Sequence, residues 1–293
     1  MPEPAGGGRV GVIGLGAMGA PIARRLAAAG HPLLVHDVSP AAAASVPGAA
    51  VAATAAEVVE GVDLLLTCLP SPEAVEAVYA EVAKPGLVAG DLSTIDPELA
   101  RRLHASLAER GVAFAECPML GGVAQAEAGE LLLVLSGPQQ ACRRLEPLFG
   151  AIARAWRHVG GPGTASLFKT VQNGLGLAQL VAIAEALTLV ERAGADPAAF
   201  VEVVNAGRGM AASPLFAARA PMMLDPDAVP NGALRIAAKD AALASATARR
   251  LGLDASLLAS TEALFAAALE AGLGERDISA VIRVVRERAD RDA

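Results

Sequence analysis

The chain has 293 residues, a length that fits one large domain or two ordinary ones, and 54% of these residues are hydrophobic while 19% are charged. A disordered chain is excluded, because the apolar residues are numerous enough to build a core. Acidic residues outnumber basic ones by 31 to 24, which gives a net charge of −7 and argues against a nucleic-acid-binding protein.

The three cysteines, Cys68, Cys117 and Cys142, form no CxxC pair, and the four histidines are scattered. We therefore expect neither a disulfide framework nor a metal site. The opening residues MPEPAGGG are acidic and glycine-rich, unlike a secretory signal. No uninterrupted apolar run reaches the roughly 18 residues of a membrane helix. The sequence predicts a cytoplasmic protein without a membrane partner.

Strand-like and helix-like segments alternate through the first half of the chain. After a tail at 1–8, the apolar segment RVGVIG predicts a buried parallel strand, and similar segments follow it. We expect strands at 9–13, 33–37, 62–70, 87–94, 112–118 and 130–137, and helices at 17–29, 40–46, 54–60, 72–83 and 96–110. This alternation predicts an α/β Rossmann domain, with a doubly wound, mostly parallel sheet, over residues 9–163.

The second half of the chain lacks a strand pattern. Its amphipathic segments predict helices at 164–193, 197–206, 233–251, 254–272 and 277–290. The glycine- and proline-rich VGGPGT near residue 160 has the composition of a linker. We therefore expect an all-α C-terminal domain over residues 164–293.

The first expected strand ends in GLGAMG, a GxGxxG motif made of Gly14, Leu15, Gly16, Ala17, Met18 and Gly19. A strand before the motif and a helix after it are the context in which it binds a dinucleotide. Gly14 permits a tight turn, Gly16 lets backbone approach a pyrophosphate, and Gly19 lets the helix pack closely on the strand. The helix N-terminus then offers unpaired N–H groups to the phosphates.

An acidic residue at the end of the second strand completes this pattern. Asp37 follows Gly14 at about the expected distance of ~20 residues. A carboxylate there binds the adenosine ribose and repels a 2′-phosphate, and no arginine follows it directly. The sequence therefore favours NAD over NADP as the cofactor.

These motifs and others in the same order resemble the β-hydroxyacid dehydrogenase family, which includes 3-hydroxyisobutyrate dehydrogenases and tartronate semialdehyde reductases. The similar segments are GLGAMGAPIARRL, CLPSPEAV (68–75), GDLSTIDP (90–97), ECPMLGGVAQAEAGEL (116–131), FKTVQNGLG (168–176), AAKDAALA (237–244) and DISAVI (277–282). The resemblance implies NAD(P)-dependent hydride transfer between a β-hydroxyacid and its semialdehyde. It also implies a small substrate with a carboxylate, and a homodimer or homotetramer built through the C-terminal domain, which would serve both substrate binding and oligomerisation.

The resemblance assigns roles to particular residues. It implies that Lys169 is the catalytic lysine and that Asn173 binds substrate. Gly121 and Gly122 match a glycine pair whose backbone meets the substrate carboxylate. The positions that match cofactor contacts are Leu69, Pro70, Thr94 and Lys239.

The residues themselves support a catalytic Lys169. Lys169 and Asn173 are four residues apart, so on a helix they share one face. Hydride transfer at an alcohol carbon needs a group that takes or returns the hydroxyl proton, and lysine can do so once burial or a nearby cation lowers its pKa. Arginine cannot. The chain has three lysines, and two of them, Lys169 and Lys239, fall at positions that the resemblance singles out.

Two residues depart from the family pattern. Leu120 stands at a substrate-binding position where the family usually has serine, so one hydrogen bond to the substrate carboxylate is lost, at a cost of roughly 1.5–3 kcal/mol. Gly232 stands where the family typically has phenylalanine. One change adds apolar bulk and the other opens space. Together they predict a substrate other than the smallest hydroxyacids of the family.

Several alternatives stay open. An imine reductase-like enzyme would reduce a C=N bond, although such enzymes usually have Asp or Tyr where this chain has Lys169. A non-catalytic dinucleotide-binding scaffold would be expected to lose the lysine, so the presence of both Lys169 and Asn173 favours an enzyme. Ser93 could contact the nicotinamide or cap the helix over 96–110, and Arg208 is a further candidate for binding an anionic substrate.

Overall fold

The computed structural model describes residues 8–207 and 209–291, and the chain divides into two compact units, Met1–Lys169 and Thr170–Ala293. The helix α8 (Thr164–Arg192) runs through this division. Arg208 lies outside the described residues, as does most of the N-terminal tail.

The N-terminal unit is built on one nine-stranded sheet. Its strands follow the order β3-β2-β1-β4-β5-β6-β8-β7, with β9 paired to β8. The strands from β3 to β6 are parallel, β8 is antiparallel to β6 and β7, and β9 is parallel to β8. Their bounds are β1 Val10–Ile13, β2 Leu33–His36, β3 Ala50–Val51, β4 Leu64–Thr67, β5 Val88–Asp91, β6 Ala113–Glu116, β7 Met119–Leu120, β8 Leu131–Ser136 and β9 Ala153–Gly160.

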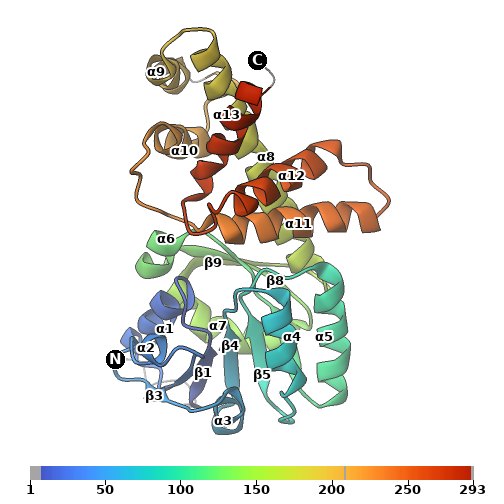
Figure 1. The fold of residues 1–293 in the computed structure, drawn as a ribbon. Helices are drawn as coiled ribbons and strands as arrows, with labels where there is room; N and C mark the ends of the chain where they lie inside the picture. The colour runs from blue at the N-terminus through green and yellow to red at the C-terminus, as the bar shows by residue number, and fades with distance from the viewer. Residues whose placement is uncertain (1–7, 208, 292–293) are drawn as a thin grey trace. The chain divides into compact units, whose positions relative to one another are not determined.

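Helices cover both faces of this sheet, as Figure 1 shows for α4 and α5 on one face and α1 and α7 on the other. Successive strand residues supply the two cores, because neighbouring side chains point to opposite faces. In β4, for example, Leu66 packs with one set of helices and Leu65 with the other. The prediction of a doubly wound, mostly parallel sheet is confirmed. The helices are α1 Gly19–Ala28, α2 Pro40–Ala43, α3 Ala55–Gly61, α4 Pro72–Ala80, α5 Pro97–Glu109, α6 Val123–Ala128 and α7 Gln139–Ile152.

Local sequence explains where most of these helices begin. Ser39, Thr54, Ser71 and Asp96 each accept a backbone N–H from the first turn of the helix that follows. Three of the four are followed at once by proline, which is tolerated in the first turn because no N–H is needed there. The helix α5 is thus capped by Asp96, which excludes the helix cap among the two alternatives for Ser93.

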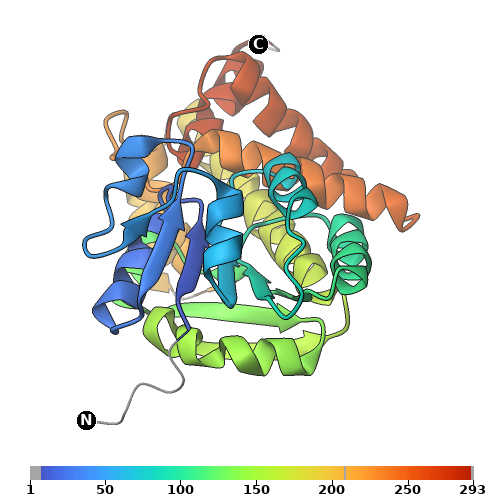
Figure 2. The ribbon, with the colours of Figure 1, turned by 90° about the horizontal axis from the view of Figure 1, so that it is seen from below.

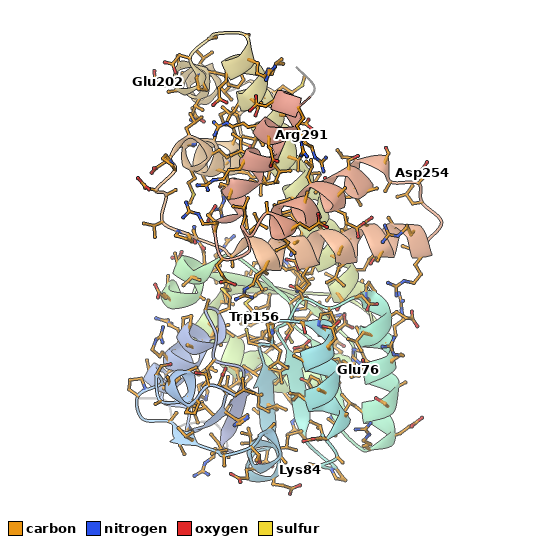
Figure 3. All side chains as sticks on the ribbon, in the orientation of Figure 1. Glu76, Lys84, Trp156, Glu202, Asp254 and Arg291 are labelled. Carbon is orange, nitrogen blue, oxygen red and sulfur yellow. The ribbon has the colours of Figure 1, made fainter. Side chains whose placement is uncertain are left out.

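The edge strand β9 was not expected from the sequence. Its residues, ARAWRHVG, include charged side chains, and most of them are partly or fully exposed. The strand forms because β8 offers it a parallel partner and because Trp156 packs against Phe149 of α7, with ring centroids 5.8 Å apart. Figure 2 shows α7 lying along the strands that precede and follow it, and Figure 3 labels Trp156. Pairing distant in sequence, rather than local pattern, defines this strand.

The C-terminal unit is helical, which confirms the second half of the fold prediction. Its core joins apolar residues from α8 and from every later helix, with Phe216, Phe265 and Val281 among the buried members. The helix α10 was not expected from the sequence, and it contains Pro221 in its interior. The elements after α8 are α9 Pro197–Gly207, α10 Pro214–Leu224, α11 Leu234–Arg250, α12 Ser256–Glu270, the 3₁₀ turn η1 Ile278–Ala280 and α13 Val281–Arg291.

The helix α8 is the longest in the described chain, with 29 residues. By length and composition alone it could cross a membrane, contrary to the expectation from the sequence. Half of its most apolar window is buried within the protein, however, which is also what the core helix of a globular unit shows.

Candidate functional site

Several of the predicted site residues follow parallel strands directly. The glycine turn follows β1, Asp37 follows β2, Leu69 comes after β4, and Thr94 comes after β5. The carboxyl ends of parallel strands meet at one edge of a sheet, and ligands of open α/β sheets bind outside that edge. The structure therefore brings the predicted cofactor-binding residues of the N-terminal unit to the same edge.

The three motif glycines differ in what their surroundings permit. A Cβ atom at Gly14, where φ is +92°, would lie 2.3 Å from the carbonyl oxygen of Cys68. A Cβ at Gly19 would lie 1.9 Å from the carbonyl oxygen of Gly14. A Cβ at Gly16 would meet no atom within 4 Å. Packing within the protein thus requires two of the glycines, whereas Gly16 borders open space of the kind a pyrophosphate needs.

Asp37 connects the glycine turn to the loop after β2. Its Oδ2 accepts the N–H of Leu15 at 2.6 Å, and its Oδ1 accepts the N–H of Ser39 at 2.8 Å. Each carboxylate oxygen has two lone pairs, so both can still accept a ribose hydroxyl. The neighbouring Val38 is 95% exposed and supplies no positive charge for a 2′-phosphate. The residues present fit a dinucleotide.

A buried polar network holds the Leu69–Pro70 loop. The Leu69 N–H donates to Ser93 Oγ at 2.9 Å, and the Ser93 hydroxyl donates to Asp91 Oδ1 at 2.6 Å. Thr67 Oγ1 donates to the same oxygen at 2.7 Å and lies 2.8 Å from the hydroxyl of Tyr79. The Ser93 side chain therefore positions the loop by accepting the backbone N–H of Leu69. Asp91 was not among the predicted site residues, although a carboxylate within an apolar strand is a sequence signal for a buried polar contact.

Burial controls ionisation in this network. It raises the pKa of Asp91 to about 6, although hydrogen bonds from Ser93 and Thr67 oppose the rise. Burial, with the negative charge of Asp91, also raises the pKa of Cys68 to about 12. Burial raises the pKa of Cys117 as well. These thiols stay protonated near neutral pH, which leaves them unsuited to act as nucleophiles.

The glycine pair predicted to meet a carboxylate lies between β7 and α6. Gly121 is exposed and has φ of +126°, a backbone conformation that glycine tolerates. The N–H of Gly122 donates to Oε1 of Gln125 at 2.9 Å, within the first turn of α6. Leu120, the last residue of β7, is half-buried. One of the two predicted backbone donors is thus already paired with a side chain.

Lys169 and Asn173 lie on one continuous helix, α8, and both side chains are half-buried. The Nδ2 group of Asn173 donates to Oδ2 of Asp240 at 2.7 Å. Lys239 Nζ lies 3.0 Å from Oδ1 of the same carboxylate. Asp240, which is 8% exposed, therefore links Asn173 and Lys239 within the C-terminal unit. Asp240 was not among the predicted site residues, and its place directly after Lys239 was the sequence feature that could have indicated it.

The third lysine has a structural role. Nζ of Lys84 donates to the carbonyl oxygens of Glu60 and Val62, at 3.1 and 2.6 Å, and lies 3.7 Å from Asp63. Lys84 precedes β5 and Val62 precedes β4, so this lysine lies at the amino edge of the sheet, opposite the glycine turn. Figure 3 shows it at the lower edge of the N-terminal unit.

Two family models match the chain. One, described as the NAD-binding domain of 6-phosphogluconate dehydrogenase, matches residues 9–160. The other, described as the NAD-binding region of NADP-dependent 3-hydroxyisobutyrate dehydrogenase, matches residues 163–285.

Individual proteins are similar along most of their length. L-threonate dehydrogenase of Cupriavidus necator is 34% identical and covers 94% of this chain and 95% of its own length. NAD-dependent L-serine dehydrogenase of Pseudomonas aeruginosa is 34% identical over 69% of this chain and 70% of its own. The crystal structure of a 3-hydroxyisobutyrate dehydrogenase from Salmonella typhimurium superposes with a TM-score of 0.84, at 32% identity, over 94% of this chain and 99% of that one.

The glycine contacts predict opposite effects for two substitutions. Gly16→Val should leave the free energy of unfolding almost unchanged, because open space receives the side chain, but should weaken NADH binding at least tenfold. Gly14→Ala should lower the free energy of unfolding by about 2 kcal/mol or more, since the added Cβ meets the Cys68 carbonyl. Urea denaturation and NADH fluorescence titration measure the two effects. Equal losses of stability in both variants would contradict this assignment.

The raised pKa of Asp91 predicts a pH-dependent stability. The folded protein binds this proton more tightly than the unfolded chain, so the contribution of Asp91 is favourable below about pH 4 and is lost as the pH rises through about 6. Relative to Asp91→Asn, the wild type should gain roughly 2 kcal/mol of unfolding free energy between about pH 7.5 and pH 4. Urea denaturation of both proteins across this range tests the expectation. A difference that does not change with pH would refute it.

Proposed function

The chain belongs to the β-hydroxyacid dehydrogenase family, and from this premise we propose that Lys169 is the general acid–base group of its reaction. The protein is an NAD(P)-dependent oxidoreductase that interconverts a hydroxyacid and its semialdehyde. The observation that carries the role of Lys169 is the placement of the three lysines. Lys84 is tied to backbone at the far edge of the sheet and Lys239 pairs with Asp240, whereas Lys169 shares a helix face with Asn173.

The proposed chemistry is a proton transfer coupled to hydride transfer. The bound nicotinamide supplies or accepts the hydride. In oxidation, Lys169 Nζ takes the proton of the substrate hydroxyl. In reduction, the Lys169 ammonium returns that proton, and its positive charge stabilises the alkoxide as it forms.

Asn173 orients the substrate through a fixed amide. Because its Nδ2 donates to Asp240, the amide cannot flip without breaking a 2.7 Å hydrogen bond to a buried carboxylate. Its Oδ1 is therefore directed away from Asp240 and can accept the substrate hydroxyl. Asp240 is a positioning residue in this scheme and does not touch the reacting atoms.

The carboxylate of the substrate is proposed to bind at the glycine pair. Gly121 offers its N–H, while the Gly122 N–H must exchange Gln125 for the substrate. Leu120 adds apolar surface in place of a hydroxyl donor. We propose on these grounds a hydroxyacid with a larger or more apolar substituent than 3-hydroxyisobutyrate or D-glycerate.

Asp37 supports NAD in preference to NADP. A 2′-phosphate on the adenosine ribose would face a carboxylate whose oxygens already bind the Leu15 and Ser39 N–H groups, and Val38 supplies no compensating cation. Two like unit charges about 4 Å apart repel by about 1 kcal/mol in water and by more near a protein surface. The relatives include an enzyme named as NAD-dependent, although one matching family model is described as NADP-dependent.

A homodimer or homotetramer in the cytoplasm completes the proposal. Several large apolar side chains of α8 and α12 are exposed, and helix faces of this kind commonly pack against a second copy of the chain. They are Leu175, Leu189, Leu257 and Leu269. The three free thiols fit a reducing compartment.

Removing Lys169 tests the catalytic role. In Lys169→Ala, kcat for the best substrate of a hydroxyacid and semialdehyde panel should fall about 10²- to 10⁴-fold, because the proton has no acceptor or donor. NADH binding should be unchanged. Nicotinamide absorbance gives the rates, and Lys84→Ala, which removes a lysine at the opposite edge, should keep the wild-type kcat. Unchanged turnover in Lys169→Ala would remove the assigned role.

Neutralising Asp37 tests the cofactor assignment. Asp37→Asn keeps the side-chain shape but removes the charge, so the ratio of kcat/KM for NAD to that for NADP should fall about tenfold, equivalent to about 1.4 kcal/mol. Val38→Ala is the matched control and should leave the ratio near the wild-type value. A wild-type enzyme that prefers NADP, or a ratio that Asp37→Asn does not alter, would show the assignment to be wrong.

A further inference from the structure

The carboxylate of Glu116, at the end of β6, has three hydrogen-bonding contacts in the core of the N-terminal unit. It is 1% exposed. Its Oε1 accepts the N–H of Gly163 at 2.6 Å and lies 3.1 Å from His104 Nε2, while its Oε2 accepts the N–H of Ser166 at 3.0 Å. The proposed reaction uses none of these contacts, so their purpose needs another explanation.

These contacts anchor the start of α8 to the sheet. The first turn of a helix leaves its N–H groups without partners inside the helix. Here Glu116 accepts the Ser166 N–H, and Ser136, the last residue of β8, accepts the N–H of Ala165 through its hydroxyl at 3.0 Å. Glu116 and Ser136 are themselves paired between β6 and β8. Two neighbouring strand ends thus cap one helix.

Glu116 carries a negative charge in this position. Burial alone raises its pKa, but the hydrogen bonds from His104, Ser166 and Gly163 outweigh burial and hold the pKa below its usual value. The other titratable groups that act on it are Asp91 of β5, the following Cys117, and Cys142 of α7. The negative charge of Glu116 therefore lies next to the N-terminus of α8, whose N–H groups stabilise it.

Lys169 follows Ser166 by three residues, which is less than one helical turn. Side chains on a helix lean toward its N-terminus, so Lys169 leans toward the end that Glu116 holds. That end carries about half a positive charge from the helix dipole, which lowers the pKa of a nearby ammonium. A carboxylate at the same end offsets this effect. The position of Glu116 therefore affects where Lys169 lies, and its charge affects the pKa of the Lys169 ammonium.

We propose that Glu116 is the positioning residue of Lys169, which fixes where this lysine leaves α8 and sets the electrostatic field in which it gains and loses its proton. His104 completes the arrangement by holding the Glu116 carboxylate from α5, where its ring also packs edge-on against Phe114. The functional consequence rests on the proposed role of Lys169, whereas the structural link between Glu116 and Lys169 does not.

Glu116→Gln tests the proposal, because it keeps the size of the side chain but removes its charge. With only three lysines in the chain, ¹³C-labelled lysine gives three resolvable ε-CH₂ signals in NMR, and Lys169→Ala identifies that of Lys169. In Glu116→Gln the titration midpoint of Lys169 should fall by about half a pH unit, with Lys84 and Lys239 unmoved. The kcat should fall roughly 10- to 100-fold while the KM for the cofactor stays the same.

Ser136→Ala is the matched control, because it removes an uncharged cap from the next N–H of the same helix. It should lower the free energy of unfolding without moving the Lys169 titration. If Glu116→Gln does not fold, Glu116→Asp keeps the charge but withdraws it by one methylene, and its kcat should fall while the Lys169 midpoint stays at the wild-type value.

The outcomes separate this inference from the proposed function. A folded Glu116→Gln with the wild-type Lys169 midpoint and wild-type kcat would overturn the positioning role, as would wild-type kcat in Glu116→Asp when Glu116→Gln cannot be folded. Full turnover in Lys169→Ala would instead overturn the proposed function. The NMR titration, which needs neither substrate nor cofactor, would then still decide whether Glu116 controls Lys169.

Discussion

The parallel direction of β1, β2, β4, β5 and β6 is the constraint on which the N-terminal unit depends. It brings every loop that follows these strands to one edge of the sheet. Residues far apart in the sequence thus become neighbours because of strand direction. The glycine turn adds a second requirement. The backbone of Gly14 approaches Cys68 so closely that a side chain has no room, which locks the turn against the loop after β4.

Two buried carboxylates on adjacent strands show how partners decide ionisation. Asp91 and Glu116 are opposite each other in the register of β5 and β6. Burial raises the pKa of both, yet the net shift is upward for Asp91 and downward for Glu116. Glu116 receives N–H groups from a helix start and a histidine, whereas Asp91 is held mainly by hydroxyls. Strand position alone does not set charge, because the donors that reach each carboxylate differ.

In the C-terminal unit a third carboxylate, that of Asp240, has a different role. Asp240 holds the amide of Asn173 and pairs with Lys239, so two residues that the family resemblance names separately share one anchor. A carboxylate in this position orders an amide that is otherwise free to present either its oxygen or its nitrogen. The candidate site is thus arranged by acidic groups that take no part in the proposed proton transfer.

The sequence alone determined what depends on neighbours along the chain. Strand and helix periodicity predicted β1, β2, β4, β5, β6 and β8, the helices α1 to α5 and the helical second half, but not the two-residue strand β3. The glycine motif predicted the turn, and the spacing of Lys169 and Asn173 predicted their common helix face. The resemblance to a family gave the candidate roles. The elements, the turn and the helix face follow from backbone geometry within a few residues, which local pattern expresses directly, whereas the roles rest on the resemblance.

Only the tertiary structure decided the contacts between distant segments. Glu116 and Gly163 are 47 residues apart, and Asn173 and Asp240 are 67 apart, so no local pattern links them. The edge strand β9 exists because it pairs with β8 and because its Trp156 packs against Phe149 of α7. Buried polar groups must find partners wherever the fold places them, and that placement is fixed only when the sheet and helices pack.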